Sequence, residues 1–312
     1  MTRRTRLAEQ LGPIDPKAVI APSLAVAFSS YVGDGSTDRS IGIGAFQPNF
    51  AWVTNRDAGG VGGDPYFKTP GMAAGQSYGV SAQLLNAGRI DVFEATGIRI
   101  DANADVNAVG VNYDVVGVRD SIDGIKILQY TGNGVDDRDV TGVGFDPEYV
   151  IVVQVSASND ANVKAPNFTA LTSGSLKSGS SSTVKIKTLI ADGFRIGTSG
   201  KVNTNGAIYE AICFKSFDGP EGKVKIQQYV GNGVDNTAVA GVGFRAKFIL
   251  VSSHVDQNAH KSENMGAFAK RHNTPTLDSD MIKSFDADGF TLGTHGSVNA
   301  NLANYSALCL SD

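Results

Sequence analysis

The chain has 312 residues, 37 glycines and a formal net charge of −4, and only 19% of its residues are charged. This composition favours a β-rich protein with many tight turns and argues against a helical or disordered one. The net negative charge argues against a nucleic-acid partner, and the lack of any apolar run of about 18 residues predicts no membrane insertion.

The first 22 residues form a basic segment with a net charge of +2, from four cationic and two anionic side chains. Residues 5–11 have the spacing of about two helical turns before Gly12 and Pro13 end the pattern. No apolar stretch of signal-peptide length follows, so we expect no secretory leader. The segment is either a disordered tail or an arm that docks on a neighbouring subunit, and we favour the arm. Its candidate partner-binding residues are Arg3, Arg4, Arg6, Leu7 and Leu11.

The rest of the chain contains the same pattern three times. A tyrosine that begins a glycine-rich turn recurs at Tyr31, Tyr130 and Tyr229, 99 positions apart in both intervals (130 − 31 and 229 − 130). This period exceeds the roughly 20–50 residues of a solenoid repeat and fits a domain of about 100 residues. It predicts three tandem modules: module 1 (23–122), module 2 (123–221) and module 3 (222–312). The repeated turn residues are Gly33, Asp34, Gly35, Gly132, Asn133, Gly134, Gly231, Asn232 and Gly233.

Each module has the pattern of an antiparallel β-sandwich. Residues 125–130 and 223–229 largely alternate apolar and polar side chains, which indicates a half-buried strand. Residues 149–153 are continuously apolar, which is typical of a strand buried on both faces. We therefore predict an all-β protein of three tandem, jelly-roll-like antiparallel sandwiches, each with roughly six to eight short strands.

The middle of each module differs between the copies, at residues 58–63, 173–182 and 260–264. Variation inside a constant frame is how surface loops behave, so we expect these segments to face outward. No long linker separates the modules. A linear string and a pseudo-threefold knob, in which one chain imitates a trimer, both stay open.

Few residues suggest catalysis. Ser77 lies in a Gly-x-Ser-x-Gly match, but residues 70–74 make a poor preceding strand and all histidines lie in module 3, so we interpret the match as a surface loop. Residues 101–107 alternate oxygen-bearing side chains as a calcium loop does, but Val106 replaces the required glycine, which favours a polar turn. The stretch 136–139, with three aspartates, is interpreted as a solvated loop rather than an acid–base pair.

The histidines and cysteines show no metal-binding spacing. The histidines are expected in loops, with an interface as one option: His254, His260, His272 and His295. Cys213 and Cys309 occupy equivalent positions in modules 2 and 3, so we expect them to be far apart, reduced and buried. We predict no catalytic residue, no metal and no cofactor.

The motif set resembles a module of structural proteins of tailed bacteriophages, mostly tail-fibre-like or capsid-associated. The resemblance covers the chain apart from the arm, and module 2 matches best. The matching residues are Tyr130, Gly132, Asn133, Gly134, Gly144, Phe145, Pro147, Asp192, Gly193, Phe194 and Asn203. Module 1 departs with Thr96 in place of the aspartate, and module 3 with Ala246 in place of the proline.

The resemblance implies a non-enzymatic virion protein that is synthesised in the host cytoplasm. Its role would be capsid decoration or head fibre, or a tail- or collar-associated fibre, with other virion proteins and copies of itself as partners. The alternative is a carbohydrate- or receptor-binding array for host attachment, which could contact a cell-surface glycan and requires exposed aromatic side chains in matching loops. Trp52, the only tryptophan, lies in an apolar run and is expected to be buried. A third hypothesis, a hydrolase acting through Ser77, depends on the glycine-rich match alone.

Overall fold

A computed structural model describes residues 25–57, 63–121, 124–178, 181–219, 222–254, 256–273 and 276–312. The predicted arm and its helical pattern lie outside the described residues. The described residues form mainly antiparallel strands in several open sheets, which confirms the predicted all-β sandwich class.

Module 1 pairs a six-stranded sheet, in the order β1-β9-β3-β4-β5-β6, with a three-stranded sheet, in the order β2-β8-β7. The larger sheet contains the first and last strands of the module. A one-turn helix, α1, precedes the last strand. The elements are β1 (Val26–Val32), β2 (Arg39–Gly42), β3 (Phe50–Asn55), β4 (Tyr66–Lys68), β5 (Gln76–Gly79), β6 (Leu84–Ala87), β7 (Ile90–Glu94), β8 (Gly97–Ile100), α1 (Ala104–Asn107) and β9 (Asn112–Val118).

Module 2 follows the same plan, with the orders β10-β17-β12-β13-β14 and β11-β16-β15. Each strand up to β14 matches the strand at the same place in module 1. The elements are β10 (Ile125–Thr131), β11 (Arg138–Thr141), β12 (Tyr149–Gln154), β13 (Asn162–Lys164), β14 (Gly174–Ser175), β15 (Ile186–Ile190), β16 (Gly193–Ile196), α2 (Gly200–Asn203) and β17 (Ile208–Phe214).

Module 3 repeats the plan with the orders β18-β19-β27-β21-β22-β23-β24 and β20-β26-β25. Its edge strand β18 comes from the range predicted for module 2. The elements are β18 (Phe217–Gly219), β19 (Gly222–Val230), β20 (Thr237–Ala240), β21 (Phe248–Ser253), β22 (Ala259–Ser262), β23 (Ala269–Arg271), β24 (Leu277–Asp278), β25 (Ile282–Asp286), β26 (Gly289–Leu292), α3 (Gly296–Asn299) and β27 (Asn304–Ser311).

Among the described residues, module 1 has nine strands and module 3 has ten, more than the predicted six to eight, whereas module 2 has eight. The expectation that the middle segments face outward is wrong for two of them. Residues 260–262 belong to the buried strand β22, and residues 173–176 are buried around β14. Residues 58–62 lie outside the described part of the chain. Two of these segments meet neighbouring modules: His260 contacts Thr54 of module 1, and Ser175 contacts Gln83 of module 1 and Asn258 of module 3.

The central strand of each larger sheet is buried on both faces, as the continuous apolar run predicts. In β12, Tyr149, Ile151 and Val153 face a hydrophobic cluster shared by all three modules. Val150 and Val152 face the opposite way, into the cluster between the two sheets of module 2. Modules 1 and 3 have equivalent clusters of their own. Each larger sheet therefore has an outer face within its module and an inner face toward the other modules.

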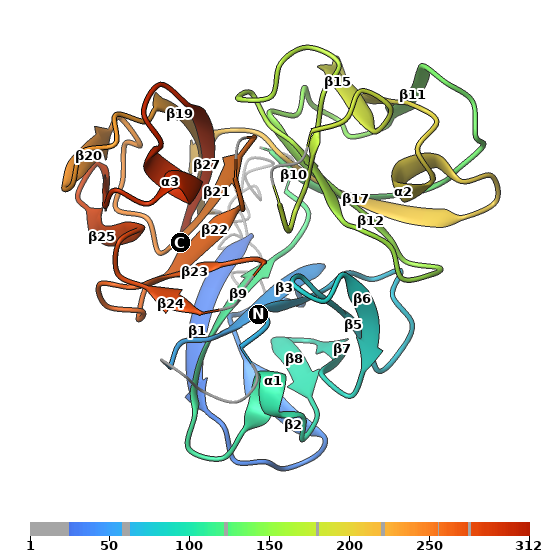
Figure 1. The fold of residues 1–312 in the computed structure, drawn as a ribbon. Helices are drawn as coiled ribbons and strands as arrows, with labels where there is room; N and C mark the ends of the chain where they lie inside the picture. Colours follow the sequence, from blue (N-terminus) through green and yellow to red (C-terminus); the bar gives the residue numbers. More distant parts are fainter. Residues whose placement is uncertain are drawn as a thin grey trace, which may run out of the picture.

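The inner faces meet in one shared core. This core contains Trp52 and Phe67 from module 1, Ile151 from module 2, and Phe248 and Leu308 from module 3, among others. Figure 1 shows the three modules arranged around a common centre, blue to teal, yellow-green, and orange to red. The chain is thus a pseudo-threefold ring, and a linear string of modules is excluded.

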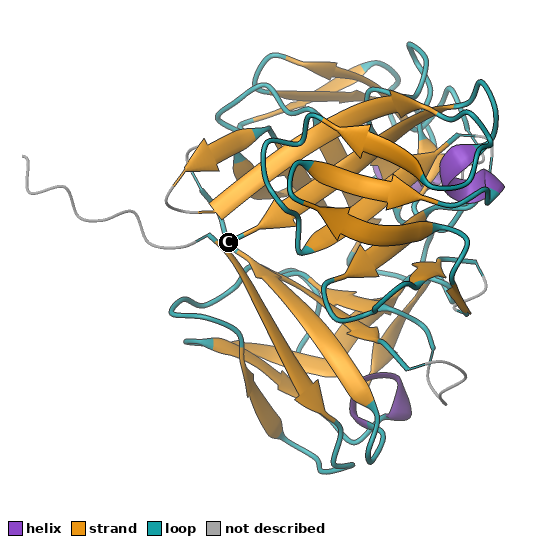
Figure 2. Ribbon diagram, turned by 90° about the vertical axis from the view of Figure 1, so that its left-hand side faces the viewer, coloured by secondary structure: helices purple, strands orange, loops and turns teal. Residues whose placement is uncertain are grey.

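The ring has two different ends. Val26 pairs with Val118, Ile125 with Phe214, and Lys223 with Ser311, so every module begins and ends at the same end of the ring. We call this the joint end. The three helices lie at the opposite end, the loop end, on the right of Figure 2, whereas the C-terminus lies on the left.

Candidate functional site

The repeated turns lie at the loop end, where a buried asparagine holds each of them. In module 2, Asn203 Oδ1 accepts the backbone N–H groups of Asn133 (2.9 Å) and Gly134 (3.3 Å). Its Nδ2 donates to the carbonyls of Val135 (2.8 Å) and Gly197 (2.9 Å). Asn107 and Asn299 contact the turns of modules 1 and 3 in the same way. The second glycine of each turn has a φ near 70°, where glycine is strongly favoured.

Pairs of stacked tyrosines hydrogen-bond the same turns to the one-turn helices. Tyr130 stacks on Tyr209 with ring centroids 5.3 Å apart, and its hydroxyl donates to the carbonyl of Val202 in α2. The Tyr209 hydroxyl donates to the carbonyl of Gly200 and accepts from the N–H of Thr204, so it bridges both ends of α2. The turn, the helix and the last strand are thus joined, and equivalent tyrosine pairs stack in modules 1 and 3.

The loop end exposes apolar side chains beside each turn. Val109 is 77% exposed and Leu302 is 80% exposed. Large aliphatic side chains normally contribute to the core, so their recurrence beside all three turns marks a candidate contact surface. The exposed residues at these tips are Val32 and Val109, Val135 and Ile208, and Val230, Val234 and Leu302.

The boundaries between modules repeat one hydrogen bond in cyclic order. The backbone N–H of Gly71 in module 1 donates to Glu210 Oε1 in module 2 (2.8 Å). That of Asn167 in module 2 donates to Ser306 Oγ in module 3 (3.0 Å). That of Asn264 in module 3 donates to Asp114 Oδ2 in module 1 (3.3 Å). Each acceptor directly follows a repeat tyrosine, so the ring closes on itself through equivalent positions.

The donor and acceptor residues of this hydrogen bond differ from one boundary to the next. A Cβ on Gly71 would lie 2.8 Å from the Glu210 carboxylate, so the long acceptor is matched to a glycine. The short acceptor Ser306 leaves room for the Asn167 side chain, which donates to the carbonyl of Ser252 (3.0 Å). Burial raises the pKa of Glu210 above its ordinary range. Such matched pairs favour one cyclic order of the modules over the others.

A buried lysine shapes each boundary loop. Lys68, Lys164 and Lys261 each donate from Nζ to two backbone carbonyls of the loop that follows. Burial lowers the pKa of each ammonium to about 8. Sequence reasoning missed these residues although a signal exists. The lysines precede the first glycines of the equivalent strands β8, β16 and β26 by nearly constant distances of 29, 29 and 28 positions (97 − 68, 193 − 164 and 289 − 261).

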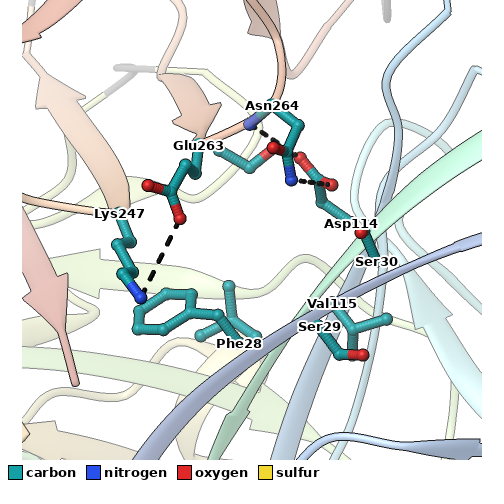
Figure 3. A pocket seen from close by; sticks show the side chains of 10 residues that line it. Phe28, Ser29, Ser30, Asp114, Val115, Lys247, Glu263 and Asn264 are labelled. Carbon is teal, nitrogen blue, oxygen red and sulfur yellow. Dashed lines mark hydrogen bonds and ion pairs between the residues drawn. The ribbon is translucent and has the colours of Figure 1, made fainter.

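A crevice of about 170 Å³ lies at the boundary of modules 3 and 1. Figure 3 shows the side chains that line it. The charged groups of the crevice are already paired. Lys247 Nζ lies 2.8 Å from Asp312 Oδ1 and 4.0 Å from Glu263 Oε2, and Asn264 Nδ2 donates to Asp114 Oδ1 (2.9 Å). Ligand pockets usually measure about 300–1,000 Å³. The crevice is therefore a boundary contact rather than a small-molecule site.

Replacing Asp114 with alanine is expected to lower the free energy of unfolding by about 3 kcal/mol, because Ser262 Oγ, the Asn264 amides and the Arg56 guanidinium lose a buried acceptor. Denaturant titration followed by circular dichroism measures the change. The control is Asp218→Ala, which removes an exposed carboxylate 3.5 Å from Lys223 and should cost at most about 0.5 kcal/mol. Equal losses in the two variants would mean that the boundary contact contributes nothing specific.

The structure places the catalytic candidates in structural roles. Ser77 lies in strand β5, fully buried, with its hydroxyl accepting the N–H of Ile90, so the surface-loop interpretation is wrong. In the calcium-like stretch, Asn103 caps α1 and Asp105 pairs with Arg89. Sequence periodicity missed α1 and its two counterparts because a four-residue helix is too short for it.

The three aspartates after the second turn lie apart from any acid–base partner. Asp136 and Asp137 pair with Lys187 at 2.7 and 2.9 Å, and Asp139 pairs with Arg195 at 2.7 Å, and all three carboxylates are exposed. Hydrogen bonds to these cations lower the pKa values of Asp136 and Asp139. These groups match the predicted solvated loop.

The histidines divide into two pairs. His260 and His272 are fully buried at the meeting point of the modules, whereas His254 and His295 reach the surface of module 3. Cys213 and Cys309 are buried free thiols, as predicted. No group of three His, Cys, Asp or Glu side chains suited to a metal ion occurs among the described residues. The described part of the chain contains no helix that is both long and apolar enough to span a bilayer.

The predicted arm residues, Arg3, Arg4, Arg6, Leu7 and Leu11, lie outside the described residues. Because Ala25 bonds to Arg119 beside the first joint, the arm is attached at the joint end. The joint end and the loop tips are the two candidate partner-binding surfaces of the ring.

Fold and boundaries together define a single-chain, three-module β-sandwich ring. A family model described as a domain of unknown function (DUF7483) matches residues 101–261. The match covers more than half of the chain, so the protein belongs to this family. The matched segment runs from the end of module 1 through all of module 2 to strand β22 of module 3. No curated protein matches the chain.

Proposed function

We propose that the protein is a non-enzymatic structural component of a bacteriophage particle, docked through its N-terminal arm. The observation that supports this best is the polarity of the ring. The first described residues after the arm, the ends of the strands that flank the joints and the C-terminus share the joint end, and the three loop tips point the opposite way (Figure 2). A protein held at one end and exposing three similar tips at the other suits capsid decoration, a head fibre, or a tail- or collar-associated fibre.

The pseudo-threefold ring adds support. Three similar modules around one axis present similar surfaces at three positions, so a single chain can match a threefold or quasi-threefold partner. The boundary bonds of Gly71, Asn167 and Asn264 close the ring within one chain. The particle would therefore receive a preassembled knob in one binding step.

The side chains that suggested an enzyme have other tasks in this structure. The Ser77 hydroxyl is fully buried and accepts a backbone hydrogen bond. The two buried imidazoles, His260 and His272, bond to Thr54, to each other and to Leu176. A serine nucleophile needs an accessible hydroxyl and an adjacent base. These contacts favour a structural protein over a hydrolase.

The glycan-binding alternative receives less support. Sugar-binding arrays need exposed aromatic faces in matching loops, and the loop tips carry valine, isoleucine and leucine instead. Among the large hydrophobic side chains that are exposed in the described residues, Phe268 is the one aromatic. Trp52 is buried in the shared core, as predicted, and the repeat tyrosines are stacked in pairs.

Rebinding to stripped particles tests the proposal. Full-length protein is expected to return to fixed positions on particles that lack it, and a variant without residues 1–22 is expected to fail, as scored by cryo-electron microscopy. A third protein, with Arg3, Arg4 and Arg6 replaced by glutamine, keeps the length of the arm but removes the charge of these three side chains. Comparing it with the truncated variant shows whether binding depends on the charge of the arm or only on its presence. If neither the full-length protein nor any variant binds, the virion role is wrong, and a glycan screen of the ring becomes the next test.

A further inference from the structure

A chain of hydrogen bonds crosses the centre of the ring through the two buried histidines. Trp52 Nε1 donates to Thr54 Oγ1 (2.9 Å), which lies 2.9 Å from His260 Nε2. His260 Nδ1 lies 3.1 Å from His272 Nε2, and His272 Nδ1 lies 2.8 Å from the carbonyl oxygen of Leu176. The chain thus joins module 1 (Trp52, Thr54) to module 3 (His260, His272) and module 2 (Leu176).

Only one arrangement of protons satisfies every atom when both imidazoles are neutral. The carbonyl of Leu176 can only accept, so His272 Nδ1 must carry a proton and its Nε2 must accept. His260 Nδ1 then donates to His272, and His260 Nε2 accepts the hydroxyl proton of Thr54. Thr54 in turn accepts from Trp52. We assign both imidazoles as Nδ1–H tautomers from this network.

Added protons break the arrangement. When the pair of imidazoles gains one proton, His260 Nε2 becomes a donor to Thr54 Oγ1. Thr54 then accepts from both Trp52 and His260, and its own hydroxyl hydrogen has no acceptor in the chain of hydrogen bonds. A second proton sets two N–H groups of His260 and His272 face to face. A buried donor without an acceptor, and a buried charge without a counter-ion, are both costly.

The charged surroundings offer no compensation. The charges that act on His260 come from His272 and from Lys270 on strand β23, whose Nζ donates to the carbonyl of Asn55 (2.6 Å). The carboxylates of Asp57, Asp64 and Asp105 act on Lys270. Strands β3 and β21 present Trp52, Thr54 and Phe248 to the imidazoles, and module 2 presents the Leu176 carbonyl. A protonated imidazole would therefore lie beside another cation.

The pKa values follow this geometry. Burial, followed by the charges of His272 and Lys270, lowers the pKa of His260 well below its usual range. Burial lowers the pKa of His272 to about 4. An unfolded histidine titrates near 6.5, so the unfolded chain binds more protons below that pH. The closed ring is therefore fully favoured above about pH 6.5 and loses up to about tenfold per pH unit for each histidine as the pH falls toward 4.

We propose that the His260–His272 pair is an acid-sensitive latch that holds module 3 on modules 1 and 2. The pair lies against the shared core: the His260 ring contacts Trp52 and Phe248, with centroids 5.3 and 5.9 Å apart, and the His272 ring contacts Trp52, with centroids 5.6 Å apart. Mild acid therefore opens the ring while the sandwich of each module stays folded. Burial raises the pKa of Glu210, so protonation of this carboxyl in acid is favoured in the closed boundary between modules 1 and 2. Acid therefore preserves that boundary. The latch acts in the free ring, whatever the partner of the protein is.

The experiment is an acid titration of the full-length protein. Trp52, as the only tryptophan, reports directly on the latch, because its emission shifts to longer wavelength when water enters. Between pH 6.5 and 4 we expect this shift, together with loss of amide protection at Asn167, which bonds to Ser306 across boundary 2–3. The amide of Ala161, which bonds to the Tyr78 hydroxyl across boundary 1–2, should stay protected. Phe194, inside module 2, should stay protected as well.

Two double variants provide the comparison. His260→Gln with His272→Asn removes both titrating groups and keeps amides at the bonding positions, so the transition should disappear from this pH window. His254→Asn with His295→Asn changes the two outer histidines, keeps a good cap on α3, and should leave the transition unchanged. Nitrogen-15 NMR of the wild-type histidines is independent of any variant, and should show two neutral Nδ1–H imidazoles at pH 7 that gain protons as the ring opens.

Three results would overturn the proposal: protonation of His260 and His272 near pH 6.5 without opening, simultaneous loss of protection at Asn167 and Phe194, or an intact ring at pH 4.

Discussion

Replacing Asn203 with alanine is expected to lower the free energy of unfolding by about 3 kcal/mol. The side chain is fully buried and satisfies two N–H groups and two carbonyls around the second turn. Alanine leaves all four without a side-chain partner, and water can reach the turn only from outside. Urea titration followed by circular dichroism measures the loss, and the slope of the transition should not change.

Two further variants sharpen this prediction. Asn203→Asp should be at least as harmful, because a carboxylate oxygen replaces Nδ2 opposite the carbonyls of Val135 and Gly197. Asn205→Ala, at an exposed position in the same loop, should change stability by no more than about 0.5 kcal/mol. If Asn203→Ala and Asn205→Ala behaved alike, the asparagine bridge would not be what holds the turn.

Replacing Trp52 with alanine is expected to cost about 4 kcal/mol, within the usual range for removing a large aromatic side chain from a core. Its ring packs between Phe67 (centroids 5.8 Å apart) and Phe248 (5.8 Å), so the cavity would have walls from different modules. Those walls belong to separate sheets and cannot easily collapse inward. The variant lacks tryptophan, so the urea titration must be followed by circular dichroism.

Phe268→Ala is the matched control, because Phe268 is 39% exposed and its loss should cost about 1 kcal/mol or less. The comparison measures how much the shared core adds to the stability of the individual sandwiches. A loss below about 1.5 kcal/mol for Trp52→Ala would mean that the modules are stable without the core between them.

Residue patterns predicted several strands of this fold correctly. The alternation in residues 125–130 and the apolar run 149–153 predicted β10 and β12, because the period of side-chain burial in a strand is set by the backbone. Tyr130 and Asn203 stood out in the repeated sequence pattern, but their convergence with Tyr209 around one turn did not. A constant spacing in the sequence shows that positions are equivalent between modules, but it does not show which residues are in contact in the fold.

The boundary residues were misjudged for a related reason. Residues 260–264 differ from their counterparts, and variation among copies is normally a surface property. Here the variation is buried, because His260 meets Thr54 of module 1, and Ser175 in the equivalent segment of module 2 meets Asn258 of module 3. Ser77 was placed in a loop because residues 70–74 make a poor strand, yet pairing with β6 supplies the strand partner that the local sequence does not suggest.

The sequence by itself determined the all-β class, the threefold repetition and the burial of Trp52, since each depends on patterns within one module. The tertiary structure alone decided that the modules close into a ring with a joint end and a loop end. It alone brought Asp114 to Asn264 and His260 to Thr54, residues 150 and 206 positions apart. The physical reason is that a strand's periodicity reports only which face is buried, whereas the partner that buries it is selected by complementary shape and hydrogen bonding between distant segments.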